Sequence, residues 1–310
     1  MKRNKILIAF LLLAASVSAQ RLPVQFSDVY SPEIPASVTL CGNTIDLDPV
    51  DRYERFDREL TSVAYTHGTT MLILKRANRY FPEMSTILER NGIPQDLLYL
   101  AVVESSLNPR AYSPAKAAGF WQFMESTAKE FGLEVNSEVD ERYNIEKATA
   151  AACRYFKKAL ARYDGDWPSV MAAYNGGMAR ITKELEAQGG DTSLDLYLVE
   201  ETTRYPYRVM AMKTLMENPG KYGFHLRADQ LYQPREYRTV EVSGPVASWP
   251  DWALNQGINY SILREENPWI RSKSLTNKLG KTYKVRIPLD DSLSRKTSGR
   301  KVFNKAWVDR

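Results

Sequence analysis

The sequence of 310 residues has few of the side chains from which metal sites and histidine-dependent nucleophiles are built. It contains two histidines, His67 and His225, and two cysteines, Cys41 and Cys153. These numbers argue against a zinc site made of histidine and cysteine, and a Ser-His-Asp triad has only two positions from which to take its histidine. Glycine-rich loops of the P-loop or dinucleotide type are also missing. We therefore expect no metal and no cofactor.

Apolar runs long enough to cross a bilayer are missing as well, and a mean hydropathy of −0.42 argues against a protein with several membrane spans. The apolar run at residues 6–15 follows three basic residues within 2–5 and precedes small residues at 17–19. This order is typical of a Sec signal peptide, and no cysteine for lipid attachment follows it. We expect removal of residues 1–19, cleavage after Ala19, and a periplasmic or envelope location without a transmembrane anchor. An uncleaved anchor is the alternative.

Export would place both cysteines in an oxidising compartment. A Cys41–Cys153 disulfide is therefore permitted, and we favour it over the alternative of two buried free thiols in separate elements. The sequence gives no geometry with which to test the pairing.

Charge is unevenly distributed along the chain, which has 42 basic and 37 acidic residues in all. Residues 226–310 carry 16 basic and nine acidic residues, a net charge of +7, whereas residues 20–225 carry 23 and 28, a net charge of −5. The basic end indicates an anionic polymer, a cell wall or a membrane surface as partner, because nucleic acid does not suit an exported protein. For the last twenty residues, a solvated charge run is the alternative.

Chain breakers and apolar periodicity divide the rest into four segments. We expect an extended leader at 20–50, a nearly all-α body at 51–225, a βααβ module at 226–289 and a basic flexible tail at 290–310. The helices expected in the body lie at 51–66, 68–80, 82–91, from Pro94 to about 107, and at 146–163, 166–174, 178–187 and 192–217. Further predictions are a Thr127–Glu130 capping box, an Asp166 cap with Pro168 in the first turn, strands at 237–242 and 283–287, and module helices at 247–256 and 259–266.

Glu104 is the candidate catalytic residue, because it lies in the last turn of a helix that is apolar on all sides. Residues 97–103 are Leu-Leu-Tyr-Leu-Ala-Val-Val, which predicts a buried helix. Burial and the negative end of the helix dipole both raise the pKa of a carboxyl group. A carboxyl group that stays protonated near neutral pH can donate its proton to a leaving oxygen. Taken alone, a helix-end glutamate is more often a solvated or paired residue.

Five motifs in order surround and follow this glutamate. They are Glu104-Ser105, the stretch 111–119, Trp121-Gln-Phe-Met124, Ala173-Tyr-Asn-Gly-Gly177 and Glu201-Thr-Thr-Arg-Tyr205. With them, residues 80–217 resemble the catalytic domain of the soluble lytic transglycosylases, and within that family the membrane-bound lytic murein transglycosylase D branch. The resemblance implies a lysozyme-like, mainly helical domain with a groove for glycan, in which Glu104 is the single catalytic acid. The implied substrate-binding residues are Ser113, Gln122, Met124, Tyr174, Asn175, Glu201 and Tyr205.

The sequence departs from the family pattern at two places. Lys116 stands where glycine is usual, which affects a loop at the groove. In the last motif the arginine is displaced to Arg204, which puts the contacts of Glu201 in doubt but keeps its spacing from Tyr205. For Trp121 and Phe123 we prefer packing in the core to contact with sugar.

The tail has a resemblance of its own. Val240–Gly244, Trp252, Asn267-Pro268-Trp269 and the stretch 283–288 are similar to a degenerate LysM module, a family that binds glycans containing N-acetylglucosamine. The usual Gly-Asp-Thr-Leu start is missing, and a βααβ packing module without glycan affinity is the alternative.

Together these features predict a mainly α protein, a lysozyme-like transglycosylase SLT domain followed by a small LysM-like module, that acts on peptidoglycan glycan strands. The resemblance implies cleavage of the β-1,4 bond between N-acetylmuramic acid and N-acetylglucosamine without water, which leaves 1,6-anhydro ends. One glutamate then acts as acid and afterwards as base, whereas ordinary glycosidases use two carboxylates. A hydrolytic lysozyme and a non-catalytic peptidoglycan-binding scaffold are the alternatives.

Overall fold

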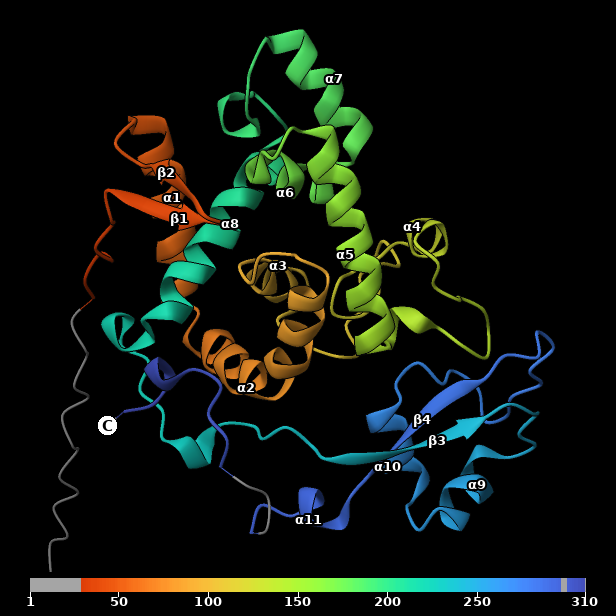
Figure 1. The fold of residues 1–310 in the computed structure, drawn as a ribbon. Helices are drawn as coiled ribbons and strands as arrows, with labels where there is room; N and C mark the ends of the chain where they lie inside the picture. Colours follow the sequence, from red (N-terminus) through yellow and green to blue (C-terminus); the bar gives the residue numbers. More distant parts are fainter. Residues whose placement is uncertain (1–28, 297–299, 310) are drawn as a thin grey trace, which may run out of the picture. The chain divides into compact units, whose positions relative to one another are not determined.

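The helix that carries Glu104 lies inside the helical body. The computed structural model describes residues 29–296 and 300–309, so the predicted signal peptide at 1–19 lies outside the described residues. Helix α3 (Leu97–Ser105) is buried along most of its length, as its all-apolar sequence predicts. It packs between α2 (His67–Arg90) and α8 (Glu200–Glu217), at the centre of the helices in Figure 1. The remaining helices of the body are α1 (Val50–Tyr65), α4 (Glu125–Glu130), α5 (Ile145–Arg162), α6 (Trp167–Gly176) and α7 (Met178–Gln188).

Local signals placed several of these helices correctly. The side chain of Asp166 accepts a hydrogen bond from the backbone N–H of Ser169 at 2.9 Å, and Pro168 lies in the first turn of α6, as predicted.

The predicted capping box at Thr127 and Glu130 is wrong, because α4 already begins at Glu125 and has no side-chain cap. The predicted break at residues 80–82 is also wrong. Helix α2 continues through Pro82 because Phe81 and Met84, on either side, are both buried in the core.

Part of the predicted leader is folded. Strands β1 (Ser37–Leu40) and β2 (Asn43–Asp46) form an antiparallel hairpin, and its turn places Cys41 and Gly42 at φ 51° and 88°. The side chain of Leu40 is fully buried in the main core, and the N–H of Cys41 donates to Oδ2 of Asp96 at 2.6 Å. The favoured disulfide is also wrong, because Cys41 and Cys153 are both free thiols.

The C-terminal module has the predicted βααβ order. Strands β3 (Tyr237–Val242) and β4 (Tyr283–Pro288) pair antiparallel, and helices α9 (Trp249–Asn255) and α10 (Tyr260–Glu266) lie between them in the chain. Its hydrophobic core is not separate from the body, because it includes Ala118, Val139 and Tyr143. The N–H of Asp140 donates to the carbonyl of Trp269 at 2.9 Å, so the module is tied to the loop before α5 by backbone as well.

The end of the chain is folded, contrary to the predicted flexible tail. Residues 290–293 form the short helix α11, and residues 300–309 pack on the body. Trp307 is 1% exposed, and its indole N–H donates to the carbonyl of Met216 at 2.7 Å. Its ring contacts Phe81 and Phe303. Within the described ranges, no helix is both long and apolar enough to cross a membrane.

Candidate active site

Glu104 lies one residue before the end of α3, and Ser106 and Leu107 end the helix by adopting positive φ values of 49° and 54°. Its carboxylate accepts a hydrogen bond from the hydroxyl of Tyr205 on α8. Burial raises the pKa of Glu104 to about 7, against the lowering effects of the Tyr205 hydrogen bond and the positive charge of Arg208; the negative charge of Glu201 adds to the rise. Glu104 as a whole residue is half-buried, and the predicted rise in the pKa of its carboxyl group is confirmed.

The negative charge of Glu104 acts on two nearby tyrosines, Tyr174 and Tyr205. Burial raises the pKa of Tyr174 and of Tyr205 well above the ordinary value, and the negative charge of Glu104 raises both further. Both phenols therefore keep their protons at any working pH. Tyr205 donates to Glu104, whereas Tyr174 donates to the carbonyl of Trp121 at 2.6 Å. Trp121 and Phe123 are buried in the core, which confirms the preferred interpretation of these residues.

The loop at 111–123 is held by its own polar side chains. Oγ of Ser113 accepts from the N–H of Ala117 at 3.0 Å. The side-chain amide of Gln122 donates to the carbonyl of Gly119 at 2.8 Å and to that of Ala111 at 3.3 Å. These contacts fix the loop conformation and engage the NH₂ group of Gln122, so its amide oxygen is the group left to face a ligand.

Sequence reasoning missed the residue that clamps this loop from behind. Arg142 is buried, and its guanidinium donates to the carbonyls of Lys116 at 2.9 Å and Phe123 at 3.1 Å. Asp140 completes the clamp by accepting from Nε of Arg142 at 2.9 Å. Gly119 sits directly against it, since a Cβ atom there would lie 1.9 Å from the carbonyl oxygen of Arg142. The only signal in the sequence is an Asp-x-Arg spacing, which is too common to single out.

Three of the predicted substrate-binding residues line one cavity, and Asn175, Glu201 and Ser113 do not. A cavity of about 260 Å³ brings Gln122, Met124 and Tyr174 together, and Met124 exposes 43% of its surface. Asn175, at the end of α6, accepts from the hydroxyl of Thr202 at 2.9 Å, which ties α6 to α8. Glu201 is exposed in the first turn of α8. Ser113 belongs to the loop, and no contact joins it directly to the other predicted residues in the described part of the chain.

The two departures from the family pattern have structural consequences. Lys116 adopts a φ of 68°, a left-handed conformation that glycine adopts without strain. Arg204 binds Glu59, a residue of α1 with 1% exposure, with 2.5 Å between Nε and Oε1. Arg208 binds the other oxygen of Glu59 at 3.1 Å. The displaced arginine therefore anchors α8 to α1, while its neighbour Arg208 also acts on the charge of Glu104.

Among residues 29–296 and 300–309, no group of three acidic, histidine or cysteine side chains could hold a metal ion. The chemistry available to the site is that of a single buried carboxyl group with phenol partners. A mainly helical domain with one such carboxyl group agrees with the lysozyme-like fold that the sequence resemblance implies.

Comparison with known families is specific about that class. Residues 83–194 match the transglycosylase SLT domain, and residues 238–291 match the soluble lytic transglycosylase C-terminal LysM-like domain. The chain therefore contains a match to each of these two domain families. The mainly α, lysozyme-like fold with a LysM-like module, predicted from the sequence, is confirmed.

Individual relatives agree with this assignment. The chain is 31% identical over 228 residues to membrane-bound lytic murein transglycosylase D of Escherichia coli strain K12, an alignment that covers 72% of this chain and 48% of that protein. It is 37% identical over 102 residues to the peptidoglycan transglycosylase of Escherichia phage T7, covering 32% of this chain and 8% of that protein. The chain thus spans about half the length of the first relative. Among solved structures, the 70 kDa soluble lytic transglycosylase of Escherichia coli is 23% identical, with a TM-score of 0.39 over 44% of this chain and 24% of that one.

Proposed function

We propose that this chain is a peptidoglycan lytic transglycosylase, which cleaves the β-1,4 bond between N-acetylmuramic acid and N-acetylglucosamine without water. One observation carries the proposal: Glu104, in a transglycosylase SLT domain, is hydrogen-bonded to Tyr205 and has a pKa raised to about 7. At neutral pH such a carboxyl group exists in both protonation states. It can therefore donate a proton in one step and accept one in the next.

The reaction then needs one proton carrier. Protonated Glu104 gives its proton to the bridging oxygen as the bond from C1 of the muramyl residue to that oxygen breaks. The carboxylate that results takes the proton of the muramyl C6 hydroxyl, whose oxygen bonds to C1 and closes the 1,6-anhydro ring. Glu104 ends in its starting protonation state, no water is consumed, and the substrate's own N-acetyl group assists at C1. The Tyr205 hydroxyl stabilises the carboxylate between the two steps.

The other predicted residues take supporting roles in this proposal. The amide oxygen of Gln122 and the exposed Met124 face the sugar from the cavity they share with Tyr174. Asn175 and Ser113 shape the backbone on either side of the groove through their hydrogen bonds. Glu201 acts through its negative charge, which raises the pKa of Glu104 and keeps the acid protonated.

We also propose that the functional unit includes the C-terminal module. The division at 51–225 and 226–289 remains our proposal for the domain limits, but the core shared through Ala118, Val139 and Tyr143 supports a module that is fixed to the body. Its similarity to a LysM-like domain and its basic charge support attachment to the wall. An envelope location after signal-peptide cleavage agrees with the relatives, which are named for murein and peptidoglycan.

Mass spectrometry of products released from purified sacculi tests the proposed reaction. Anhydro products weigh one water less than hydrolytic products, and a binding scaffold releases neither. We expect anhydro products, at a rate that falls as pH rises through about 7, because the donor must begin protonated. Products with reducing ends would instead assign the protein to the hydrolytic lysozymes.

A further inference from the structure

A second cavity, of about 430 Å³, is lined in part by the loop that follows α3. Helix α2 supplies one wall through Arg76, Arg79 and Glu83, and residues 108–110 supply the roof. The module closes the opposite side through residues of α10 and β4. The volume is in the range of pockets that hold small ligands. None of the residues assigned above to glycan cleavage lines this cavity.

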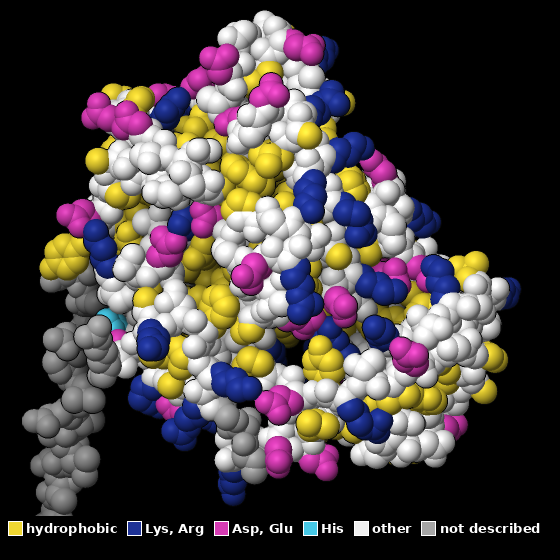
Figure 2. All heavy atoms as spheres, in the orientation of Figure 1, with side chains coloured by type: hydrophobic (Ala, Val, Ile, Leu, Met, Phe, Trp, Pro, Cys, Tyr) yellow, Lys and Arg dark blue, Asp and Glu magenta, His cyan; other side chains and the backbone are white. Residues whose placement is uncertain are grey.

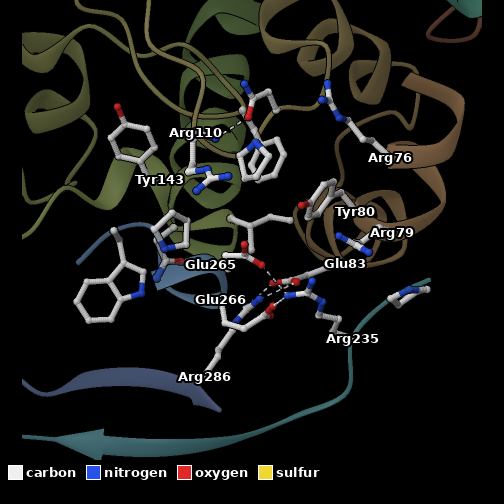
Figure 3. Close-up of a pocket in the computed structure, with 18 of the residues that line it drawn as sticks. Arg76, Arg79, Tyr80, Glu83, Arg110, Tyr143, Arg235, Glu265, Glu266 and Arg286 are labelled. Atoms are coloured by element: carbon white, nitrogen blue, oxygen red, sulfur yellow. Dashed lines mark hydrogen bonds and ion pairs between the residues drawn. The ribbon is translucent and has the colours of Figure 1, made fainter. Parts of the chain in front are cut away.

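The cavity carries more positive than negative charge after its internal pairs are removed. Arg286 is neutralised by Glu83, with Nη1 2.9 Å from Oε2, and Arg235 is paired with Glu266. Figure 3 shows these four side chains gathered at one end, joined by dashed lines. Within the described residues, the other lining arginines, Arg76, Arg79 and Arg110, form no ion pair with a carboxylate.

Three guanidinium groups are therefore available to an anionic ligand. Arg76 donates to the carbonyl of Ser106 at 3.0 Å, which holds it in place. Arg79 donates to the carbonyl of Gln233 at 3.0 Å and also lies 5.3 Å from the ring centre of Tyr232. The Arg110 side chain is exposed, and no hydrogen bond or ion pair joins its guanidinium to another described residue. Arg76 and Arg79 come from α2, and Arg110 faces them across the cavity (Figure 3). Each retains N–H groups that can bind carboxylate oxygens.

Negative charge also lines the cavity, and it limits the chemical class of ligand that can bind there. Glu265 lies on the module side of the cavity, and its side chain is 46% exposed. Apolar surface comes from Phe120, Tyr80 and Pro268. Glu266 is paired with Arg235, and Glu265 lies 3.6 Å from the same guanidinium, so one positive charge faces two carboxylates and the module side keeps a negative charge. A ligand with both carboxylates and an amine matches the two sides. A short peptide with acidic groups at one end and an amine at the other has that chemistry.

We propose that this cavity is a second binding site, which takes the carboxylate-bearing peptide stem of peptidoglycan. The inference rests on the proposed function for the substrate class, but it uses none of the residues of the cleavage site. Arg76 holds Ser106, which ends the helix of Glu104, and Arg110 lies in the same loop. A stem bound here is therefore held beside the segment that carries the catalytic acid.

Calorimetry with a defined peptide tests the site. The probe is the tripeptide L-alanyl-γ-D-glutamyl-L-lysine with free carboxylates, compared with the same peptide amidated at both carboxyl groups. In the wild-type chain, we expect the free acid to bind and amidation to weaken binding by about tenfold or more, as loss of charge-assisted hydrogen bonds predicts. Arg110→Gln should weaken the free acid to a similar extent. Arg90→Gln, at the exposed end of α2, is the matched control and should change nothing.

The outcomes separate this inference from the proposed function. Equal binding of free and amidated peptide, or full binding by Arg110→Gln, would overturn the site. Peptide-free glycan strands should be cut equally well by the wild-type chain and by Arg110→Gln, since Arg110 has no part in cleavage. A wild-type chain that releases anhydro products but binds no tripeptide refutes the second site alone. A wild-type chain that binds the tripeptide as described but cleaves no glycan supports the second site and refutes the proposed transglycosylase activity.

Discussion

Glu104→Gln should make the protein more stable at alkaline pH, although it removes the proposed catalytic group. The folded chain holds the pKa of Glu104 at about 7, above its ordinary value of 4.5, because the buried carboxyl group resists ionisation. Folding therefore favours the protonated form. Stability tied to this group is fully present below about 4.5 and is lost as pH rises toward about 7, since the folded state binds more protons over that interval.

The size of the effect follows from the same two values. At about 1.36 kcal/mol for each pH unit between them, ionisation of Glu104 destabilises the fold by at most about 3 kcal/mol above pH 8. Glutamine has nearly the same shape, stays uncharged, and its amide oxygen can still accept from Tyr205. We therefore expect the free energy of unfolding of Glu104→Gln to exceed that of the wild-type chain by about 1–3 kcal/mol at pH 8.5 and to match it near pH 4.5.

Urea denaturation of both proteins at the two pH values measures this difference. The other acidic groups titrate alike in both proteins, so they cancel in the comparison. Glu54→Gln, an exposed residue on α1, is the matched control and should show no pH-dependent gain. A gain that is the same at both pH values, or a variant less stable than the wild-type chain at pH 8.5, would refute a buried acid with a raised pKa.

Three further substitutions test the structure around the site. Gly119→Ala should destabilise the fold by at least about 3 kcal/mol, because its Cβ would lie 1.9 Å from a backbone oxygen; Gly165→Ala, also at positive φ but in open space, should cost only about 1 kcal/mol in the same urea assay. Lys116→Gly should raise the melting temperature slightly, by relieving a φ of 68° with a gain of up to about 1 kcal/mol, and an unchanged or lower value would contradict the strain. Trp307→Ala should cost about 3–5 kcal/mol by calorimetry, more than exposed Phe303→Ala, and a small effect would restore the idea of a loose tail.

The sequence predicted best those features that depend on neighbouring residues. The burial of α3 follows from an apolar run, the start of α6 from Asp166 and Pro168, and strands β3 and β4 from alternation over six residues. Glu104 could be selected because its helix and its motif point to the same residue.

Features that depend on distant contacts escaped prediction. Strands β1 and β2 have four residues each and are held through Val38 and Leu40 against helices far along the chain. Trp307 is buried against residues distant in sequence such as Phe81, and its N–H donates to the carbonyl of Met216, 91 residues away. Continuation of α2 through Pro82 likewise reflects tertiary packing rather than propensity.

The same limit applies to the site. The clamp formed by Arg142 and Asp140 forms only when the loop at 111–123 lies within hydrogen-bond distance of Arg142. No local sequence pattern predicts that contact. Two cysteines in a chain expected to be exported permit a disulfide but supply no geometry, and the two thiols proved to be free. The basic cavity beside α2 takes its walls from segments about 200 residues apart in the sequence, such as those of Glu83 and Arg286.

The most direct test of the central claim is the rate at which Glu104→Gln releases anhydro products from sacculi, measured by mass spectrometry at pH 6 beside the wild-type chain. Loss of a general acid and base should lower the rate by about a hundredfold to ten-thousandfold or more. The variant should keep its fold, as its unfolding transition will show. A folded Glu104→Gln protein that releases anhydro products at nearly the wild-type rate would contradict the assignment of Glu104 as the proton donor.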